Sequence, residues 1–305
     1  MTKISMIKGE GSNPNALKTL KGYTLSGKIA HTQRKITEWH DFYKGNVYVS
    51  FSGGKDSLVL LHLARSMFPD IEAVFSDTGL EFPEIRDFVK TIENVTWVKP
   101  KLSFKQVLEK YGYPIISKEQ ACYIDQYRNT KSEYLKGVRF NGKEGYKNKG
   151  IGKISEKWKY LIDAPFKISD RCCYVLKKNP IKSYEKKSGK YPIIGTMAQE
   201  SSIRAINYNR NGCNAYSLKR PVSCPISFWN EDDIWDYIKL HDIKYCSVYD
   251  MGYKRTGCVF CMFGLHLEKE DRLKKLEETH PNLFNYCMEK LNLKTILKWY
   301  PRREL

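Results

Sequence analysis

The chain has 305 residues, of which 41% are hydrophobic, so it has enough apolar content for a buried core and is not a chain disordered throughout. Lysines and arginines outnumber aspartates and glutamates by 52 to 34, and this net charge of +18 favours a polyanionic partner. No apolar run approaches the roughly 18 residues of a membrane span, and the first residues, MTKISMIKGEGSN, lack the apolar stretch of a secretion signal, so we expect a cytoplasmic chain with no membrane partner.

Strands and helices alternate in the first third of the chain. The predicted elements are a polar arm or short helical preface over residues 1–30, a helix over 36–42, a strand over 47–51, a helix after residue 56, a strand over 71–75, a helix over 83–92 and a strand at VTWV. Short loops join these elements. The pattern predicts an α/β fold with a doubly wound, mostly parallel sheet and helices on both faces.

The middle of the chain is basic, and periodic patterns return after it. Residues 128–167 contain 11 Lys/Arg against 4 Asp/Glu, interleaved with aromatic side chains. This segment is either a solvated surface insertion or a groove for a nucleic-acid backbone. The later predicted elements are a strand at YPIIGT, a helix start at AQESSIRAI, a helix at NEDDIWDYIKLH and a helical segment over residues 269–299.

These elements suggest three parts. We expect an N-terminal arm over residues 1–30, a nucleotide-binding domain over 31–245 with the basic insertion at about 125–170, and a C-terminal segment over 246–305 that holds a CxxC motif and helices. Ligands of doubly wound sheets bind at the carboxyl ends of the strands. The turns after the first two strands of this sheet therefore become the candidate site.

The turn after the first strand predicts an anion site. It reads Ser52-Gly53-Gly54-Lys55-Asp56-Ser57, and Asp56 stands where a Walker loop needs a hydroxyl, so it is a different loop. The glycines let backbone N–H groups converge on an anion, and the following helix points its positive end there. Lys55 adds a cation, and the two serines add hydroxyl donors. A pyrophosphate group fits this combination.

Two later motifs add candidate ligands. Asp77 follows the second strand and can accept a hydrogen bond from a ribose or adenine group or help to hold a metal. In GTMAQESSIRA, Gly195 lets the backbone approach a nucleotide, while Glu200 and Arg204 stand four residues apart on one predicted helical face. That spacing also suits an ordinary surface ion pair.

Four of the nine cysteines have the spacing of metal ligands. Cys172 and Cys173 are adjacent, and Cys258 and Cys261 form a CxxC motif. A CxxC pair brings two thiolates to one metal centre, and a second pair closes the shell. Adjacent cysteines suit tetrahedral zinc poorly, since their side chains diverge. Zinc and unmetallated thiols remain as alternatives.

The motifs resemble those of a known family. SGGKDS after a strand resembles the signature of the pyrophosphate-loop ATP enzymes, which cleave ATP between the α and β phosphates. DTGLEFPE, GTMAQESSIRA and YDMGYKRTGCVFC resemble successive motifs of the phosphoadenosine phosphosulfate reductase family, from about Val47 to Cys261. The resemblance implies an adenine nucleotide alpha hydrolase-like fold and makes Arg204 a phosphate or sulfate ligand. It also implies a 4Fe-4S cluster on the four cysteines, with Cys173 the weakest ligand.

Three functions follow from this resemblance. The favoured one is an adenylylating sulfurtransferase in which ATP and Mg²⁺ bind at the glycine turn, Lys55, Asp56 and Asp77 act catalytically, and tRNA or DNA receives sulfur from a donor such as a cysteine desulfurase. The second is an assimilatory adenylylsulfate or phosphoadenylylsulfate reductase. Its usual nucleophile is a cysteine in a C-terminal Glu-Cys-Gly context, and no cysteine follows Cys287 here. The third is a non-catalytic nucleotide or nucleic-acid binding module.

Overall fold

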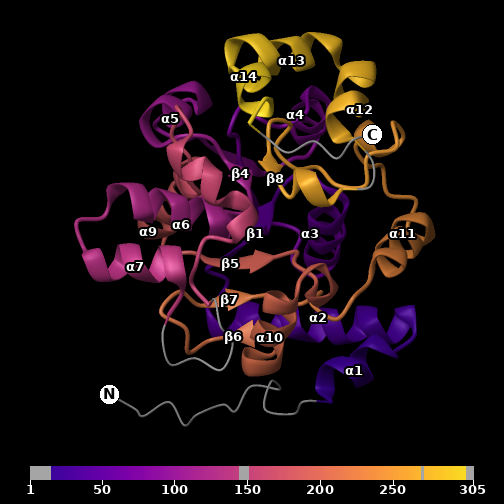
Figure 1. The fold of residues 1–305 in the computed structure, drawn as a ribbon. Helices are drawn as coiled ribbons and strands as arrows, with labels where there is room; N and C mark the ends of the chain where they lie inside the picture. The colour runs from indigo at the N-terminus through magenta and orange to yellow at the C-terminus, as the bar shows by residue number, and fades with distance from the viewer. Residues whose placement is uncertain (1–14, 144–150, 269–270, 300–305) are drawn as a thin grey trace. The chain divides into compact units, whose positions relative to one another are not determined.

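The computed structural model describes residues 15–143, 151–268 and 271–299 (Figure 1). The chain divides into two compact units. The first unit contains the residues up to Asp77, together with Phe82–Val98 and Ile181–Thr256. The second contains Thr78–Glu81, Lys99–Pro180 and the residues from Gly257 onward. Residues 1–14 of the predicted arm, residues 144–150 of the basic segment and residues 269–270 lie outside the described part. The domain bounds expected from the sequence stay a prediction.

The first unit is built on a six-stranded sheet with the strand order β3-β2-β1-β5-β7-β6. Its strands are β1 Val47–Phe51, β2 Glu72–Ser76, β3 Val95–Val98, β5 Tyr191–Ile194, β6 Asn214–Ala215 and β7 Val222–Ser223. All neighbouring pairs are parallel except β6 and β7. Figure 1 shows β1, β5, β7 and β6 in this order. The expected α/β class and mostly parallel sheet are confirmed.

The strand order creates a switch point between β1 and β5. The chain runs from β1 outward to β2 and β3, and then returns to the other side of β1 with β5. In doubly wound sheets, ligands bind at such a point, beyond the carboxyl ends of the two strands. Here those ends lead into Ser52 and Gly195. The topology therefore brings the two glycine motifs of the sequence to one edge of the sheet.

The helices of this unit include those expected after residue 56, over 83–92 and at NEDDIWDYIKLH, whereas Ala16–Lys21 and Asn179–Ser188 were not predicted as separate helices. The helices are α1 Ala16–Lys21, α2 Leu25–Phe42, α3 Lys55–Met67, α4 Pro83–Lys90, most of α9 Asn179–Ser188, α10 Ser202–Asn211 and α11 Glu231–Leu240. Helix α2 begins eleven residues before the predicted start at Ile36. Its first half buries polar side chains that have partners: Lys28 Nζ lies 2.6 Å from Asp233 Oδ2, and Thr32 donates to the Pro225 carbonyl. An apolar pattern cannot reveal such a face.

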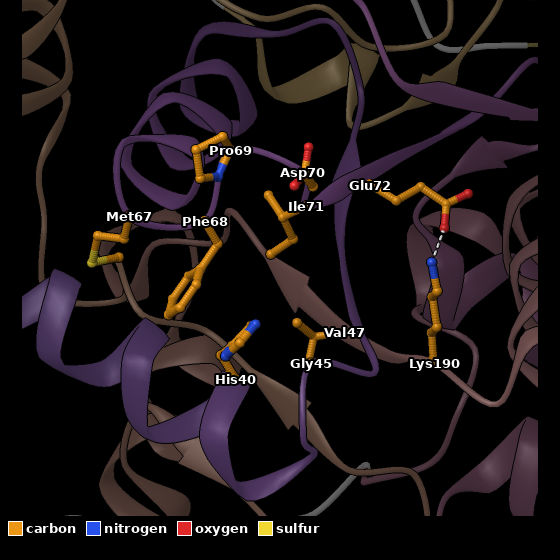
Figure 2. Close-up of a pocket in the computed structure, with 10 residues that line it drawn as sticks. All are labelled: His40, Gly45, Val47, Met67, Phe68, Pro69, Asp70, Ile71, Glu72 and Lys190. Carbon is orange, nitrogen blue, oxygen red and sulfur yellow. Dashed lines mark hydrogen bonds and ion pairs between the residues drawn. The ribbon is translucent and has the colours of Figure 1, made fainter.

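A cavity of about 320 Å³ lies at the opposite, amino ends of β1, β2 and β5 (Figure 2). The ring of His40 stacks on Phe68 on one side of it, and Lys190 pairs with Glu72 on the other. The Glu72 carboxylate also accepts hydrogen bonds from Thr96 and Tyr184, so it is fully occupied by donors. The cavity is lined by His40, Gly45, Val47, Met67, Phe68, Pro69, Asp70, Ile71, Glu72 and Lys190. It contains none of the predicted site residues.

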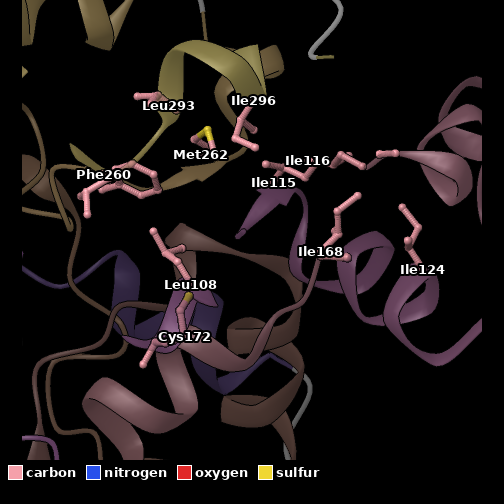
Figure 3. Packing of buried hydrophobic residues seen from close by; sticks show 14 of the residues in the cluster. Leu108, Ile115, Ile116, Ile124, Ile168, Cys172, Phe260, Met262, Leu293 and Ile296 are labelled. Carbon is pink, nitrogen blue, oxygen red and sulfur yellow. The ribbon is translucent and has the colours of Figure 1, made fainter. Parts of the chain in front are cut away.

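The second unit has its own apolar core, formed by segments distant in sequence (Figure 3). A short parallel pair, β4 Ile115–Ile116 and β8 Met262–Phe263, crosses it. Around this pair lie α5 Phe104–Tyr111, α6 Lys118–Asn129, α7 Glu133–Asn141, α8 Arg171–Cys173, α12 Arg272–Thr279, α13 Pro281–Asn285 and α14 Leu293–Leu297. Shorter 3-10 and π segments cover Glu156–Asp163, Tyr174–Lys178, Leu265–Leu267 and Tyr286–Lys290. Burial of Leu108, Ile116 and Phe260 in this core stabilises the unit by about 2 kcal/mol per side chain.

The C-terminal segment is helical, as predicted, but interrupted. Pro281 opens α13 directly after α12, because proline cannot donate the backbone hydrogen bond that would continue the earlier helix. Asn292 takes a left-handed φ of 56° before α14 begins. None of the helices within the described ranges is long and apolar enough to cross a membrane.

Candidate active site

The two glycines of the turn after β1 are required for different reasons. Gly53 has a left-handed φ of 73°, and a Cβ there would lie 2.8 Å from the side chain of Ile85 and 2.9 Å from that of Val89. Gly54 has an ordinary φ of −84°, but its Cβ would lie 2.6 Å from Thr256 Oγ1. The turn thus packs α4 against one glycine and the segment around Thr256 against the other. Both residues are glycine because neighbouring atoms leave no room for a side chain.

The two serines of the turn hold its shape. Ser57 Oγ donates to the Gly54 carbonyl at 2.9 Å and accepts the Ser52 N–H at 3.1 Å. The hydroxyls of Ser52 and Ser57 lie 3.0 Å apart, and Ser52 Oγ accepts the Gly54 N–H at 3.3 Å. The sequence predicted these hydroxyls as ligand donors, and in this structure they bind the backbone of the turn itself. They fix the turn that precedes α3.

Lys55 is buried and surrounded by acceptors. It is 5% exposed, and its Nζ lies 3.2 Å from Glu231 Oε1 and 3.6 Å from Asp56 Oδ1. Nζ also donates to the Lys254 carbonyl at 3.3 Å and lies over the rings of Trp235 and Tyr249. No sequence motif pointed to Glu231, Trp235 or Tyr249, since they come from α11 and the segment after it.

Asp56 carries an orphaned oxygen. Its Oδ1 is buried and accepts no hydrogen bond from the part of the chain that the structure describes, although the Lys55 ammonium lies within ion-pair distance. Burial raises the pKa of Asp56, and the nearby Lys55 charge opposes that rise. A buried carboxylate oxygen with no donor is suited to a cation ligand. Such a group fits the Mg²⁺ that accompanies a nucleotide triphosphate.

Asp77 follows β2 and is also buried, with 5% of its surface exposed. Its Oδ2 accepts a hydrogen bond from Arg86 Nη2 at 3.1 Å. Arg86 comes from α4, and its Nε is buried without a hydrogen-bond partner among the described residues. Arg86 was not predicted as a site residue, although it stands nine residues after Asp77 on the predicted helix.

Gly195, directly after β5, is in close contact with the start of α3. A Cβ on Gly195 would lie 3.2 Å from the Asp56 carbonyl oxygen and from the Ser57 N and Cα atoms. The glycine thus lets the turn after β5 pack on the backbone of the predicted anion site. This close approach is between two protein segments, whereas the sequence suggested an approach to a nucleotide.

Glu200 and Arg204 form an ion pair, but they do not share a helical face. Glu200 ends the 3-10 turn Ala198–Glu200, and Ser201 caps α10, which begins at Ser202. A second arginine, Arg255, lies with its Nη2 3.4 Å from Glu200 Oε1. Burial and the neighbouring Arg255 charge lower the pKa of Arg204. One carboxylate therefore binds two arginines, and no sequence motif predicted the second.

The four predicted metal-ligating cysteines are neighbours in the second unit. Cys172 Sγ donates to Cys173 Sγ at 4.0 Å, and Cys172 also interacts electrostatically with Cys258 and Cys261. The hydrogen bond from Cys172 and the charges of Lys118 and Lys177 lower the pKa of Cys173. Burial raises the pKa of Cys258, and Lys177 opposes it.

The thiols do not close around a single ion. Within residues 15–143, 151–268 and 271–299, no three His, Cys, Asp or Glu side chains are arranged to hold one metal ion. In an iron-sulfur cluster each cysteine binds a separate iron, so the sulfur atoms need not surround one point. Four grouped thiols beside two lysines fit the anionic cluster better than a single zinc ion. None of the nine cysteines, which include Cys122, Cys213, Cys224, Cys246 and Cys287, forms a disulfide within the described residues.

Much of the basic segment 128–167 is structural. Arg128 donates to four carbonyl oxygens, those of Leu161, Ile162, Ala164 and Phe166, at 2.6–2.9 Å. Arg139 binds Gln126 Oε1 and the Gly152 carbonyl in the same way. The exposed aromatic side chains are Tyr134, Phe140 and Tyr160, at 72%, 38% and 42%. Part of the segment therefore stabilises the fold through these internal hydrogen bonds, and its outer surface is aromatic and basic.

Residues 46–164 and 124–263 match the model of the phosphoadenosine phosphosulfate reductase domain, which includes every motif from Ser52 to Cys261. An uncharacterized protein of Methanocaldococcus jannaschii is 30% identical over 84% of this chain. An adenosine 5′-phosphosulfate reductase of Staphylococcus haemolyticus is 26% identical over 74% of this chain and 75% of its own length.

The chain spans about half of the archaeal relative, 51% of its length. Among solved structures, a phosphoadenylyl-sulfate reductase from Candida auris in a phosphate complex is 18% identical, with a TM-score of 0.44 over 79% of this chain and 91% of that chain.

Proposed function

The chain belongs to the phosphoadenosine phosphosulfate reductase domain family, and on that basis we propose that it is an adenylylating sulfurtransferase acting on a nucleic acid. An oxygen of the acceptor attacks the α-phosphorus of ATP, the bond to the β-phosphate breaks, and pyrophosphate leaves. Sulfur at the oxidation level of hydrosulfide then attacks the activated atom, and AMP departs with the electron pair of the broken bond to oxygen. Activation is needed because an oxygen anion is a poor leaving group.

The observation that carries the proposal is the convergence of Lys55, the α3 N-terminus and the glycine turn at the switch point of the sheet. The first N–H groups of a helix have no partners inside it, and they bind phosphate oxygens readily. Lys55 adds a positive charge where the pyrophosphate leaving group becomes more negative. Arg204 and Arg255 offer two guanidinium groups for other phosphate oxygens.

Asp56 and Asp77 take different roles in this proposal. Asp56 Oδ1, the buried oxygen without a hydrogen bond, holds the cation that accompanies ATP. Mg²⁺ at that oxygen would neutralise charge on the phosphates during transfer. Asp77 is fixed by Arg86 and accepts a hydrogen bond from the ribose or adenine of the substrate.

The cysteines of the second unit supply the sulfur-handling part of the proposal. Cys172, Cys173, Cys258 and Cys261 would hold a 4Fe-4S cluster, which would supply a place for sulfur to bind or would order the site. Lys118 and Lys177 stabilise the thiolate forms that such ligands require. The donor of the sulfur would be a cysteine desulfurase or a protein of similar chemistry. Because its persulfide sulfur is two electrons more oxidised than hydrosulfide, a dithiol reductant would reduce that sulfur and become a disulfide.

A nucleic acid is the proposed acceptor because of charge and surface chemistry. The net charge of +18 attracts a polyanion, and exposed aromatic side chains at Tyr134 and Tyr160 are available to stack on bases. Both tRNA and DNA fit this description.

A second function, reduction of adenylylsulfate or its 3′-phosphorylated form, is favoured by a specific observation. The Staphylococcus haemolyticus relative is named an adenosine 5′-phosphosulfate reductase, and it aligns with 74% of this chain. That reaction also needs an anion site for an adenine nucleotide, and it needs a thiol to attack the sulfur. Release of sulfite from either nucleotide with thioredoxin, under anaerobic conditions, would favour this reaction.

The deciding experiment is mass spectrometry of nucleosides from tRNA and of nucleotides from DNA. Cells that lack the gene are complemented with the wild-type chain, with Lys55→Ala, or with Lys90→Ala as a matched exposed lysine in the same unit. We expect a thionucleoside or phosphorothioate with the wild type and Lys90→Ala, and none with Lys55→Ala. Identical modification profiles in all strains would refute the sulfurtransferase. Pyrophosphate release from ATP that is lost in Lys55→Ala would rule out a purely non-catalytic module.

A further inference from the structure

One segment of the first unit covers the predicted phosphate site. The residues from Tyr249 to Thr256 pack against the glycine turn, and the Tyr249 hydroxyl accepts the Lys55 N–H at 2.8 Å. At the position of a Cβ on Gly54, Tyr249 Oη would lie at 3.2 Å and Thr256 Oγ1 at 2.6 Å. These oxygens occupy the space next to the turn.

The Lys55 N–H matters because of its place in α3. Lys55 is the first residue of the helix, so its N–H has no acceptor within the helix. Phosphate oxygens bind such N–H groups in helix-capped anion sites. In this structure the hydroxyl of Tyr249 takes that donor.

The side chain of Lys55 is held by the same segment and by α11. Its Nζ donates to the Lys254 carbonyl at 3.3 Å, and it lies 5.4 Å from the centre of the Tyr249 ring. Glu231 Oε1 lies 3.2 Å from the same Nζ. Both donors of Lys55, the backbone and the ammonium, are therefore bound to protein oxygens.

We propose that the Tyr249–Thr256 segment occupies the position of a phosphate group, and that a pyrophosphate group binds by displacing the Tyr249 hydroxyl from the Lys55 N–H. This inference rests on the proposed nucleotide site and names its positioning residue. The exchange is favourable because a charged phosphate oxygen accepts a stronger hydrogen bond than a neutral hydroxyl does. Tyr249 is neutral at physiological pH, since burial raises its pKa to about 12.

The first test is the affinity of the full chain for inorganic pyrophosphate, measured by titration calorimetry. Tyr249→Phe keeps the ring but removes the oxygen, so the Lys55 N–H loses its acceptor. We expect the dissociation constant to fall about fivefold, which corresponds to about 1 kcal/mol. Tyr216→Phe is the matched control in the same unit, because the Tyr216 hydroxyl accepts a hydrogen bond from Asn214, outside the Tyr249–Thr256 segment. Its dissociation constant should match that of the wild type.

The second test uses the wild-type chain alone, by hydrogen exchange read in peptides. Pyrophosphate should slow exchange in the peptide that contains residues 53–57 and accelerate it in the peptide that contains 249–256. AMP, which lacks the pyrophosphate group, should not accelerate exchange in the second peptide. Slower or unchanged exchange over 249–256 on pyrophosphate binding would show that the segment stays closed, and the inference would be wrong.

The outcomes separate this inference from the proposed function. If the wild type binds pyrophosphate and Tyr249→Phe binds it no more tightly, the displacement is refuted while the anion site stands. Binding by Tyr249→Phe alone would support the displacement. If neither chain binds pyrophosphate or ATP, the nucleotide site itself is refuted, and the displacement with it.

Discussion

Replacing Gly54 with alanine tests how tightly the turn after β1 is packed. The backbone of Gly54, with φ −84° and ψ 158°, is one that alanine adopts without strain, so the effect is steric. The added Cβ would lie 2.6 Å from Thr256 Oγ1, and ordinary contact begins at 3.4 Å, so the oxygen must retreat by 3.4 − 2.6 = 0.8 Å. Tyr249 Oη, at 3.2 Å, must also shift.

The expected destabilisation follows from this overlap. Overpacking of a closed site costs about 1–3 kcal/mol in the free energy of unfolding. Alanine is also a poorer N-cap than glycine for α3, which adds about 0.5 kcal/mol. Removing the obstructing oxygen with Thr256→Ala should relieve the steric part and leave the capping part. The double variant should therefore be more stable than the sum of the single effects implies.

Urea unfolding of the wild type, Gly54→Ala, Thr256→Ala and the double variant measures this coupling. We expect a coupling free energy of about 1 kcal/mol or more between the two sites. Gly137→Ala is the matched control, because Gly137 lies within α7 with no atom near its Cβ position, and alanine there should stabilise the chain by about 0.5–1 kcal/mol. Additive effects of Gly54→Ala and Thr256→Ala, within about 0.5 kcal/mol, would refute the packing argument.

Three further predictions concern single groups. Burial alone would raise the pKa of Glu72, but hydrogen bonds from Lys190, Thr96 and Tyr184 outweigh burial and lower the pKa below the ordinary 4.5. The ionised Glu72 therefore stabilises the folded chain above pH 4.5, and this stabilisation is lost as the pH falls through the pKa of the folded state. Glu72→Gln should then lower the free energy of unfolding at pH 7 by about 2 kcal/mol, with a difference that shrinks in acid, and a constant difference would contradict this. Arg128→Lys should lower the free energy of unfolding in urea by about 3 kcal/mol, because lysine cannot bind four carbonyls. An unchanged urea midpoint would argue against the structural role of Arg128. Cys258→Ser should lose iron after anaerobic reconstitution while Cys122→Ser keeps it, and equal iron in both would count against the proposed ligands.

Local patterns predicted the first unit well where burial is apolar. The strand Val47–Phe51 and the start of α4 at Pro83 lie where the sequence indicated, because β-branched runs and proline act locally. The first half of α2 was missed because its buried face is polar, and only the distant partners of Lys28 and Thr32 make that burial favourable. The ion pair between Glu200 and Arg204 had the spacing of a helix, but the cap at Ser201 separates them.

In the candidate site, too, local features were predicted and contacts between distant segments were not. The sequence identified the residues from Ser52 to Ser57, because their glycines, lysine, carboxylate and hydroxyls all lie in one turn. It missed Arg86, Glu231, Tyr249 and Arg255, which reach Asp77, Lys55 and Glu200 from other segments of the first unit. The spacing of an arginine or a tyrosine along the chain does not reveal which carboxylate or N–H it will meet.

By itself the sequence determined the strand-turn-helix around Gly53, the alternation that makes a parallel sheet, and the grouping of cysteines into two pairs. These features depend on neighbours within a few residues, where backbone sterics and apolar periodicity act. Only the tertiary structure decided that β5 lies beside β1, that Asp56 keeps a buried oxygen without a donor, and that Tyr249 covers the Lys55 N–H. Those outcomes depend on contacts between residues that are distant in the chain, and such contacts form only when the whole unit packs.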